Sequence, residues 1–390
     1  MQRDELSAWL RLTLTPGLGP HSARKLLSAF GLPPAIWQQS NAALGQVLTK
    51  AQVQAVQTEP DTLAAVLDQT WAWLHEDQAR EQNRRVAVLG DAHYPAGLLN
   101  LDDPPLMLYM IGQAGYVASD AACEALVLRS EASLAMVGSR NPTPQGLTNA
   151  RQFAKAMVQA GLAVVSGLAL GIDGAAHAGA LEGLDGAPAA PATVAVVGTG
   201  LDRVYPKAHL ALAHRIAERG LIISEYPLGT PPLTANFPKR NRLIAALARG
   251  TLVVEAALQS GSLISARLSM EQGKEVFAIP GSIHAAQSRG CHALIKQGAK
   301  LVESAQDILE ELNWSLAMPS TSLAAEPGQG TERPREHALL EALGYDPVSM
   351  EVLAARTALS TAHLQASLMS LELEGLVARL PGGLYQRQAG

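Results

Sequence analysis

Residues 193–198 read Thr193-Val194-Ala195-Val196-Val197-Gly198, a run without a charged side chain that ends in glycine. Continuous apolar runs of this kind are typical of parallel strands that are buried on both faces of a sheet. Helical patterns of about 10–15 residues separate such runs, which is the rhythm of βαβ units. We therefore predict an α/β domain with a doubly wound sheet, whose strands lie at 85–90, 134–138, 162–166, 193–198, 221–225, 251–255, 275–279 and 300–302.

The segments on either side of this domain, which we place at 83–314, have different patterns. Residues 1–82 contain short helical patterns and no strand pattern, which predicts an all-α module. Residues 315–335 are rich in Ser, Thr, Pro, Gly and Glu, a composition typical of a flexible linker. Residues 336–390 predict a winged helix, because three helical patterns precede a hairpin. The helical patterns lie at 336–343, 349–355 and 361–374, and the two strands of the hairpin at 376–380 and 384–387.

The composition is that of an ordinary globular protein. The chain has 390 residues, of which 48% are hydrophobic and 17% charged, and its net charge is −5. This length predicts about two to four domains. Cys123 and Cys291 are too few for a disulfide framework, and the sequence shows neither an apolar run of membrane-spanning length nor a signal-peptide pattern. We therefore expect a cytoplasmic protein that does not enter a membrane.

Positive charge is concentrated in one part of this acidic chain. Residues 203–242 hold seven Lys or Arg against two acids. Three of these cations begin a predicted helix, in the segment Asn236-Phe237-Pro238-Lys239-Arg240-Asn241-Arg242. Cations at a helix N-terminus oppose the helix dipole at a cost of roughly 0.3–1 kcal/mol each, so the arrangement predicts a bound anion. Phe237 is either a stacking ring beside these cations or a core residue.

Further candidate phosphate ligands follow four of the predicted strands. They are Gly138, Ser139 and Arg140; Ser166 and Gly167; Lys207; and Gly261 and Ser262. The carboxyl ends of parallel strands meet at one edge of a sheet, where open α/β proteins bind their ligands. Each motif alone could be a surface cation or a helix cap. Together they predict a row of phosphate sites, which suits a single-stranded polymer with bases stacked on aromatic rings.

Two patterns that would indicate a cofactor or a metal are incomplete. Glycines at 167, 171 and 174 do not form a dinucleotide-binding fingerprint, so we expect no cofactor. Asp173 and His177 stand four residues apart on a predicted helix, but no third ligand accompanies them. We expect a capping aspartate and a packed histidine, and no metal.

The order of these motifs resembles that of the DNA-processing protein A family. The matching stretches include Gly138-Ser139-Arg140, Tyr205-Pro206-Lys207 and Phe237-Pro238-Lys239-Arg240-Asn241-Arg242, and they extend over about residues 90–302. The resemblance implies an extended Rossmann-like domain that binds and protects incoming single-stranded DNA, forms a homodimer and loads the RecA recombinase during natural transformation. It also implies that Arg140 and Lys207 are the principal phosphate contacts, with Lys239, Arg240 and Arg242 extending the groove.

Two other interpretations stay open at this point. In a nucleotide phosphoribohydrolase, Arg140 would hold the phosphate and Glu255 would act as acid and base, although we expect a protein without catalytic activity. A transcription factor acting through the winged helix is disfavoured, because the predicted winged helix has few basic residues with which to bind DNA: Arg356, Arg379 and Arg387. Residues 15–20, Thr-Pro-Gly-Leu-Gly-Pro, resemble a helix-hairpin-helix element within a SAM-like module, and leave DNA contact there open.

Overall fold

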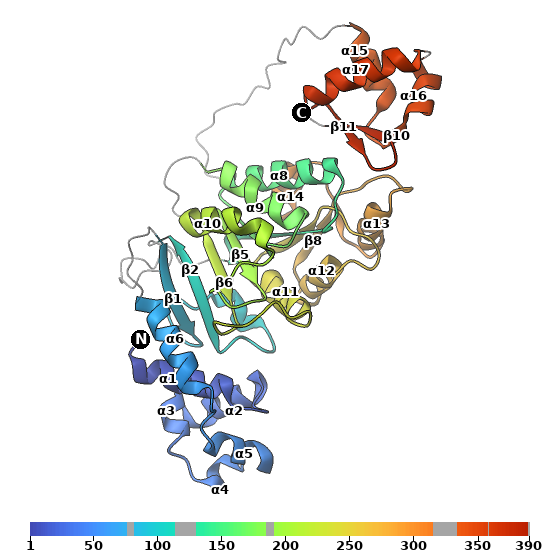
Figure 1. The fold of residues 1–390 in the computed structure, drawn as a ribbon. Coiled ribbons are helices and arrows are strands. Elements are labelled where there is room, and N and C mark those ends of the chain that lie inside the picture. The colour runs from blue at the N-terminus through green and yellow to red at the C-terminus, as the bar shows by residue number, and fades with distance from the viewer. Residues whose placement is uncertain (76–81, 114–129, 185–190, 315–333, 358, 389–390) are drawn as a thin grey trace.

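The computed structural model describes residues 1–75, 82–113, 130–184, 191–314, 334–357 and 359–388 (Figure 1). Most of the linker predicted at 315–335 lies outside the described residues, but its last two residues belong to a helix that begins at Pro334. The predicted module boundary at residue 82 coincides with the start of a strand at Gln82.

The N-terminal part of the chain is helical, as predicted. Its helices are α1 (Arg3–Leu14), α2 (Pro20–Phe30), α3 (Pro33–Ile36), α4 (Asn41–Leu44), α5 (Lys50–Gln57) and α6 (Leu63–His75). Leu6, Trp9 and Leu10 of α1 are buried in a cluster that also contains Val86 and Tyr109 of the sheet. The helical module is thus packed onto the edge of the α/β domain.

The central domain contains a nine-stranded sheet in the order β1-β2-β6-β5-β4-β3-β7-β8-β9. All eight predicted strands are present, and a ninth, β2, was not predicted. The strands are β1 (Gln82–Val88), β2 (Met107–Gln113), β3 (Ser133–Val137), β4 (Ala163–Ser166), β5 (Thr193–Val197), β6 (Leu221–Ser224), β7 (Gly250–Val253), β8 (Glu275–Ala278) and β9 (Lys300–Leu301). From β6 to β9 all neighbouring pairs are parallel, whereas β2 is antiparallel to both of its neighbours.

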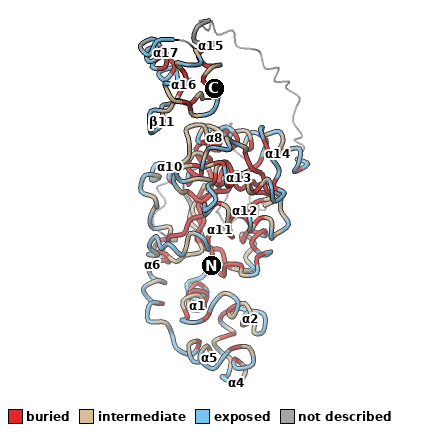
Figure 2. Tube along the Cα trace, turned by 90° about the vertical axis from the view of Figure 1, so that its right-hand side faces the viewer, coloured by how far each residue is buried: buried red, intermediate tan, exposed pale blue. Residues whose placement is uncertain are grey.

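Helices cover both faces of the sheet, which explains why its strands are apolar throughout (Figures 1 and 2). In β3, Leu134 and Met136 pack toward α8 (Pro144–Gln159) and α9 (Ile172–Glu182), while Ala135 and Val137 pack toward α11 (Asn236–Ala246). The first face also carries α10 (Leu210–Arg219) and α14 (Ala305–Glu311), and the second carries α12 (Ser262–Glu271) and α13 (Arg289–Lys296). The predicted doubly wound architecture is confirmed.

The strand order places a topological switch point beside β3. The chain proceeds outward from β3 through β4 and β5 to β6, and then continues with β7 on the other side of β3. Helices that follow strands on the two sides of such a point leave a crevice at the carboxyl ends of the strands.

The C-terminal part forms the predicted winged helix. It comprises α15 (Pro334–Leu343), β10 (Val348–Ser349), α16 (Met350–Thr357), α17 (Thr361–Leu373), β11 (Val377–Leu380) and β12 (Leu384–Arg387), and its short sheet has the order β10-β12-β11. Leu339, Leu353, Leu368 and Tyr385 belong to its separate apolar cluster. Among all the helices of the described residues, none has the length and apolar composition needed to span a bilayer.

Candidate nucleic-acid interface

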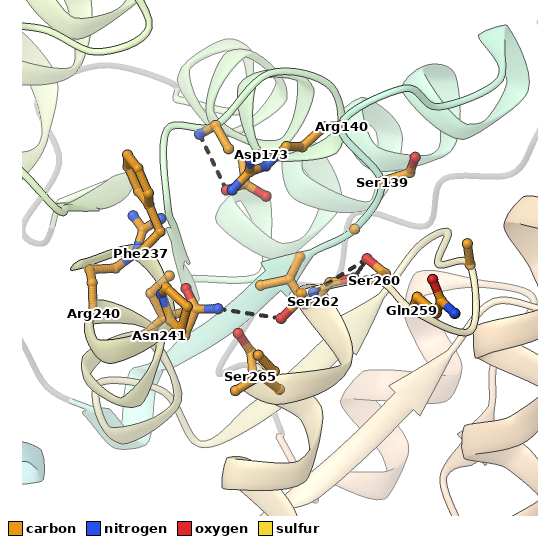
Figure 3. Close-up of a pocket in the computed structure, with 18 of the residues that line it drawn as sticks. Ser139, Arg140, Asp173, Phe237, Arg240, Asn241, Gln259, Ser260, Ser262 and Ser265 are labelled. Carbon is orange, nitrogen blue, oxygen red and sulfur yellow. Dashed lines mark hydrogen bonds between the residues drawn. The ribbon is translucent and has the colours of Figure 1, made fainter. Parts of the chain in front are cut away.

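A pocket of about 590 Å³ occupies the switch point between the carboxyl ends of β3 and β7 (Figure 3). The loop after β3 contributes Gly138, Ser139 and Arg140 to it. The first residues of α11 and α12 face it from two other sides, and Asp173 in the first turn of α9 lines it as well. Helix N-termini carry a partial positive charge that attracts anions, so the starts of α11 and α12 favour an anionic ligand, whereas the Asp173 carboxylate at the start of α9 does not.

A cation and two aromatic rings lie in contact with one another at this pocket. The guanidinium carbon of Arg140 lies 5.8 Å from the ring centroid of Phe237. The Phe237 ring is in turn 5.6 Å from that of Tyr205, at 33° between ring planes. Tyr205 is 49% exposed, and Lys207, which begins the 3-10 helix η4 (Lys207–His209), is also exposed. The structure thus brings together side chains from the loop after β3, the loop after β5 and the start of α11.

The three cations at the start of α11 have different environments. Lys239 is exposed, and its Nζ lies 5.8 Å from the ring centroid of Tyr226. Arg240 is only 4% exposed and donates hydrogen bonds to the carbonyl oxygens of Gly167 (2.7 Å) and Val196. Burial lowers the pKa of Arg240 to about 10, against the opposing effect of Asp173.

Arg242 is also buried, at 8% exposure, and forms ion pairs with Glu225 and Asp103. The sequence-based assignment of Arg240 and Arg242 to direct phosphate contact is therefore corrected: in this structure their guanidinium groups bind the protein itself.

Ser166 and Gly167 also differ from the prediction. Ser166 is fully buried, and its hydroxyl donates to the carbonyl oxygen of Met136 (2.6 Å), so it cannot reach a ligand at the surface. Gly167 is buried too, and a Cβ on it would lie 2.6 Å from a guanidinium nitrogen of Arg240. Glycine is needed here for close packing of Arg240 rather than for approach of a phosphate. Neither residue lines the pocket.

The start of α12 lies at the pocket. Gly261, not Ser262, is the N-cap residue, and the Ser262 N–H donates to the hydroxyl of Ser260 (3.3 Å). A Cβ at Gly261 would meet no atom within 4 Å, so this backbone is openly accessible. Asn241 of α11 donates from Nδ2 to the Gly261 carbonyl (3.4 Å), which connects the two helix starts.

Asp173 and His177 have structural roles, close to those expected. Asp173 accepts hydrogen bonds from the N–H groups of Gly167 (3.1 Å) and Ala169 (3.3 Å), which fixes the loop between β4 and α9. The Thr193 hydroxyl donates to the Val164 carbonyl, so it must accept from Nδ1 of His177 (2.7 Å). Burial lowers the pKa of His177 to about 3 and keeps it neutral at ordinary pH. Within the described parts of the chain, His, Cys, Asp and Glu residues form no group that could hold a metal ion.

Glu255, the acid and base of the hydrolase interpretation, lies outside the pocket at the start of α8. Its carboxylate accepts from the N–H (3.0 Å) and from the hydroxyl (2.6 Å) of Thr143, the N-cap residue of α8. Burial raises the pKa of this carboxyl. The geometry explains Glu255 as part of a helix cap.

The sequence reasoning missed several polar residues of the pocket. Ser265 lines it together with Ser262, because the two are three residues apart and share one face of α12. That spacing could have been found in the sequence. Thr234 and Gln259 also line the pocket, but they lie in irregular segments, and no pattern marks them.

A sequence model of the family described as DNA recombination-mediator protein A matches residues 85–313, more than half of the chain. The chain belongs to this family. The DprA winged helix domain matches residues 323–383, which agrees with the fold of the C-terminal part.

Relatives of known name support the DprA assignment. Protein Smf of Synechocystis is 31% identical over the whole of both chains. The DNA processing protein DprA of Streptococcus pneumoniae is 43% identical over 58% of this chain and 74% of its own. The X-ray structure of S. pneumoniae DprA covers 81% of this chain and 99% of that one, with 32% identity and a TM-score of 0.63.

Proposed function

We propose that this DprA family member binds single-stranded DNA along the carboxyl edge of its sheet. One observation carries the proposal: Arg140, Phe237 and Tyr205, which all line the pocket, lie in one continuous series of contacts. Exposed Lys207 and Lys239 are close to Tyr205 and Phe237 in the sequence. Guanidinium and ammonium groups would hold phosphates, and the rings would stack on bases.

The arrangement favours single strands over duplex DNA. Stacking on a protein ring requires the face of an unpaired base, and in a duplex both faces are covered by neighbouring base pairs. Because rings accept every base and phosphates carry no sequence information, we expect little sequence preference. Arg140 and Lys207 are the principal phosphate contacts in this proposal, with Lys239, Gly138, Ser139, Gly261 and the start of α12 beside them.

The wider role that we propose follows from family membership. The family model is named for recombination mediation, and relatives are named DNA processing proteins. We propose a cytoplasmic, non-catalytic homodimer that protects incoming single-stranded DNA and delivers it to RecA in natural transformation. The engagement of Glu255 in a helix cap supports the non-catalytic part.

Salt-dependent binding tests the proposal. Affinity for an oligo-dT should fall in Arg140→Ala and in Lys207→Ala, and the slope of log affinity against log salt should become shallower by about 0.7 for each phosphate that the variant no longer neutralises. Arg219→Ala is the matched control, because this exposed arginine ends α10 at the opposite, amino-terminal edge of the sheet. Unchanged affinity and slope in both edge variants would refute the proposed site.

A further inference from the structure

Arg242 belongs to an ion-pair cluster that joins three segments of the chain. Its side chain is 9% exposed, its Nε lies 3.3 Å from Oδ2 of Asp103, and its terminal nitrogen forms a close ion pair with Glu225, whose side chain is 7% exposed. Arg242 comes from the second turn of α11, Glu225 directly follows β6, and Asp103 lies in the loop before β2. A guanidinium held in this way has two carboxylates as partners and little surface left for a phosphate.

The loop that supplies Asp103 is itself fixed at several points. The Tyr94 hydroxyl donates to the carbonyl oxygen of Pro105 (2.7 Å), across the loop. Gly97 packs against the last turn of α11 so closely that a Cβ would lie 2.6 Å from the carbonyl oxygen of Ala246. Arg24 of the helical module donates to the Asp102 carbonyl oxygen. The loop thus contacts the second and the last turn of α11 and connects that helix to the N-terminal module.

The start of α11 depends on such contacts because it lacks the usual cap. Its N-cap residue, Ala235, has no side-chain oxygen to accept from the first N–H groups, and residues 231–235 before it are exposed. Asn236 donates from Nδ2 to the Gly198 carbonyl (3.0 Å), and Arg240 and Arg242 fix the next turn. Phe237 and Lys239 lie between these anchoring residues.

We propose that Arg242, Glu225 and Asp103 form a positioning cluster for the DNA-binding edge. The cluster holds the first turns of α11 so that Phe237 stays beneath Arg140 and Lys239 stays at the surface. Arg242 therefore supports binding without contacting a phosphate. This inference rests on the proposed function, since it concerns the same edge.

Neutralising Glu225 or Asp103 distinguishes a positioning role of Arg242 from a phosphate-binding role, because the two roles predict opposite changes in affinity for oligo-dT. If Arg242 were a phosphate ligand, Glu225→Gln or Asp103→Asn would free its charge, so affinity for oligo-dT would rise and the salt slope would steepen. If the cluster positions α11, the same variants should weaken binding roughly threefold to tenfold while the slope stays that of the wild type. Glu218→Gln is the control, because it removes one exposed acid from α10, away from the edge.

A folding measurement and the binding of the wild type keep the test decisive. Thermal unfolding followed by circular dichroism identifies a variant that fails to fold, and Asp103→Asn is the milder change because that side chain is 42% exposed. A rise in affinity together with a steeper slope in a folded variant would overturn the inference, as would wild-type affinity in both variants. If the wild type itself does not bind oligo-dT, the proposed function fails, and that result is distinct from either outcome in the variants.

Discussion

The three cations at the start of α11 have different roles because their side chains leave the helix in different directions. Successive residues of an α-helix are separated by about 100° around its axis. Lys239 consequently faces solvent, Arg240 faces the ends of β4 and β5, and Arg242 faces Glu225. The local charge pattern predicts an anion site, and burial and pairing select which cations remain available to it.

His177 provides a test of burial at the residue scale. Its pKa is lowered from 6.5 to about 3 by desolvation, so as the pH falls below 6.5 the unfolded chain takes up a proton that the folded protein does not. The free energy of unfolding should therefore decrease between pH 6.5 and pH 3, by up to about 1.4 kcal/mol per pH unit from this group. His177→Asn keeps a donor for the Thr193 hydroxyl and has no proton to gain. Urea unfolding from pH 7 to pH 4.5 should show a shallower pH dependence for this variant, and equal slopes would contradict the account.

At the scale of elements, β2 shows where the strand prediction failed. The segment Met107–Gln113 is largely apolar and begins two residues after Pro105, which is a usable strand signal. The prediction relied on the βαβ rhythm, and β2 interrupts that rhythm because it pairs with β1 in an antiparallel hairpin. The parallel strands were recognised because burial on both faces makes them continuously apolar, which is a property of the local sequence.

The cap that Glu255 forms at the start of α8 should contribute to stability. Replacing Glu255 by Ala leaves the N–H and hydroxyl of Thr143 without their acceptor, which should lower the free energy of unfolding by about 1–3 kcal/mol in urea titrations.

The wild type should release no free base from nucleoside 5′-monophosphates, since both carboxylate oxygens of Glu255 are engaged in the cap. Measurable turnover that disappears in Glu255→Gln would favour the hydrolase interpretation instead.

At the scale of the whole molecule, the winged helix and the α/β domain have separate apolar cores. The candidate interface is built entirely from residues 137–265 of the α/β domain. A chain that ends at residue 333 should therefore keep its affinity for oligo-dT within about twofold of the full chain. Electrophoretic or fluorescence titration of both proteins measures this. A large loss of affinity would place part of the DNA site on the winged helix.

The sequence alone was sufficient to define the architecture, and it predicts where the candidate site lies. Apolar runs that end in glycine or serine define parallel strands, and polar residues that follow such strands must gather at one edge of the sheet. These are local patterns with a geometric consequence, so they can be read without coordinates.

Only the tertiary structure decided which of the gathered residues are free to bind a ligand. Arg242 is paired with Asp103, which is far away in the sequence. Ser166 is buried and donates to a carbonyl of the neighbouring strand, and Phe237 lies between Arg140 and Tyr205 from two other loops. The burial and the partners of a side chain depend on segments that the chain brings together from a distance. A local motif of cations and glycines therefore predicts an anion site, whereas the division of its residues into contacts and supports follows from packing.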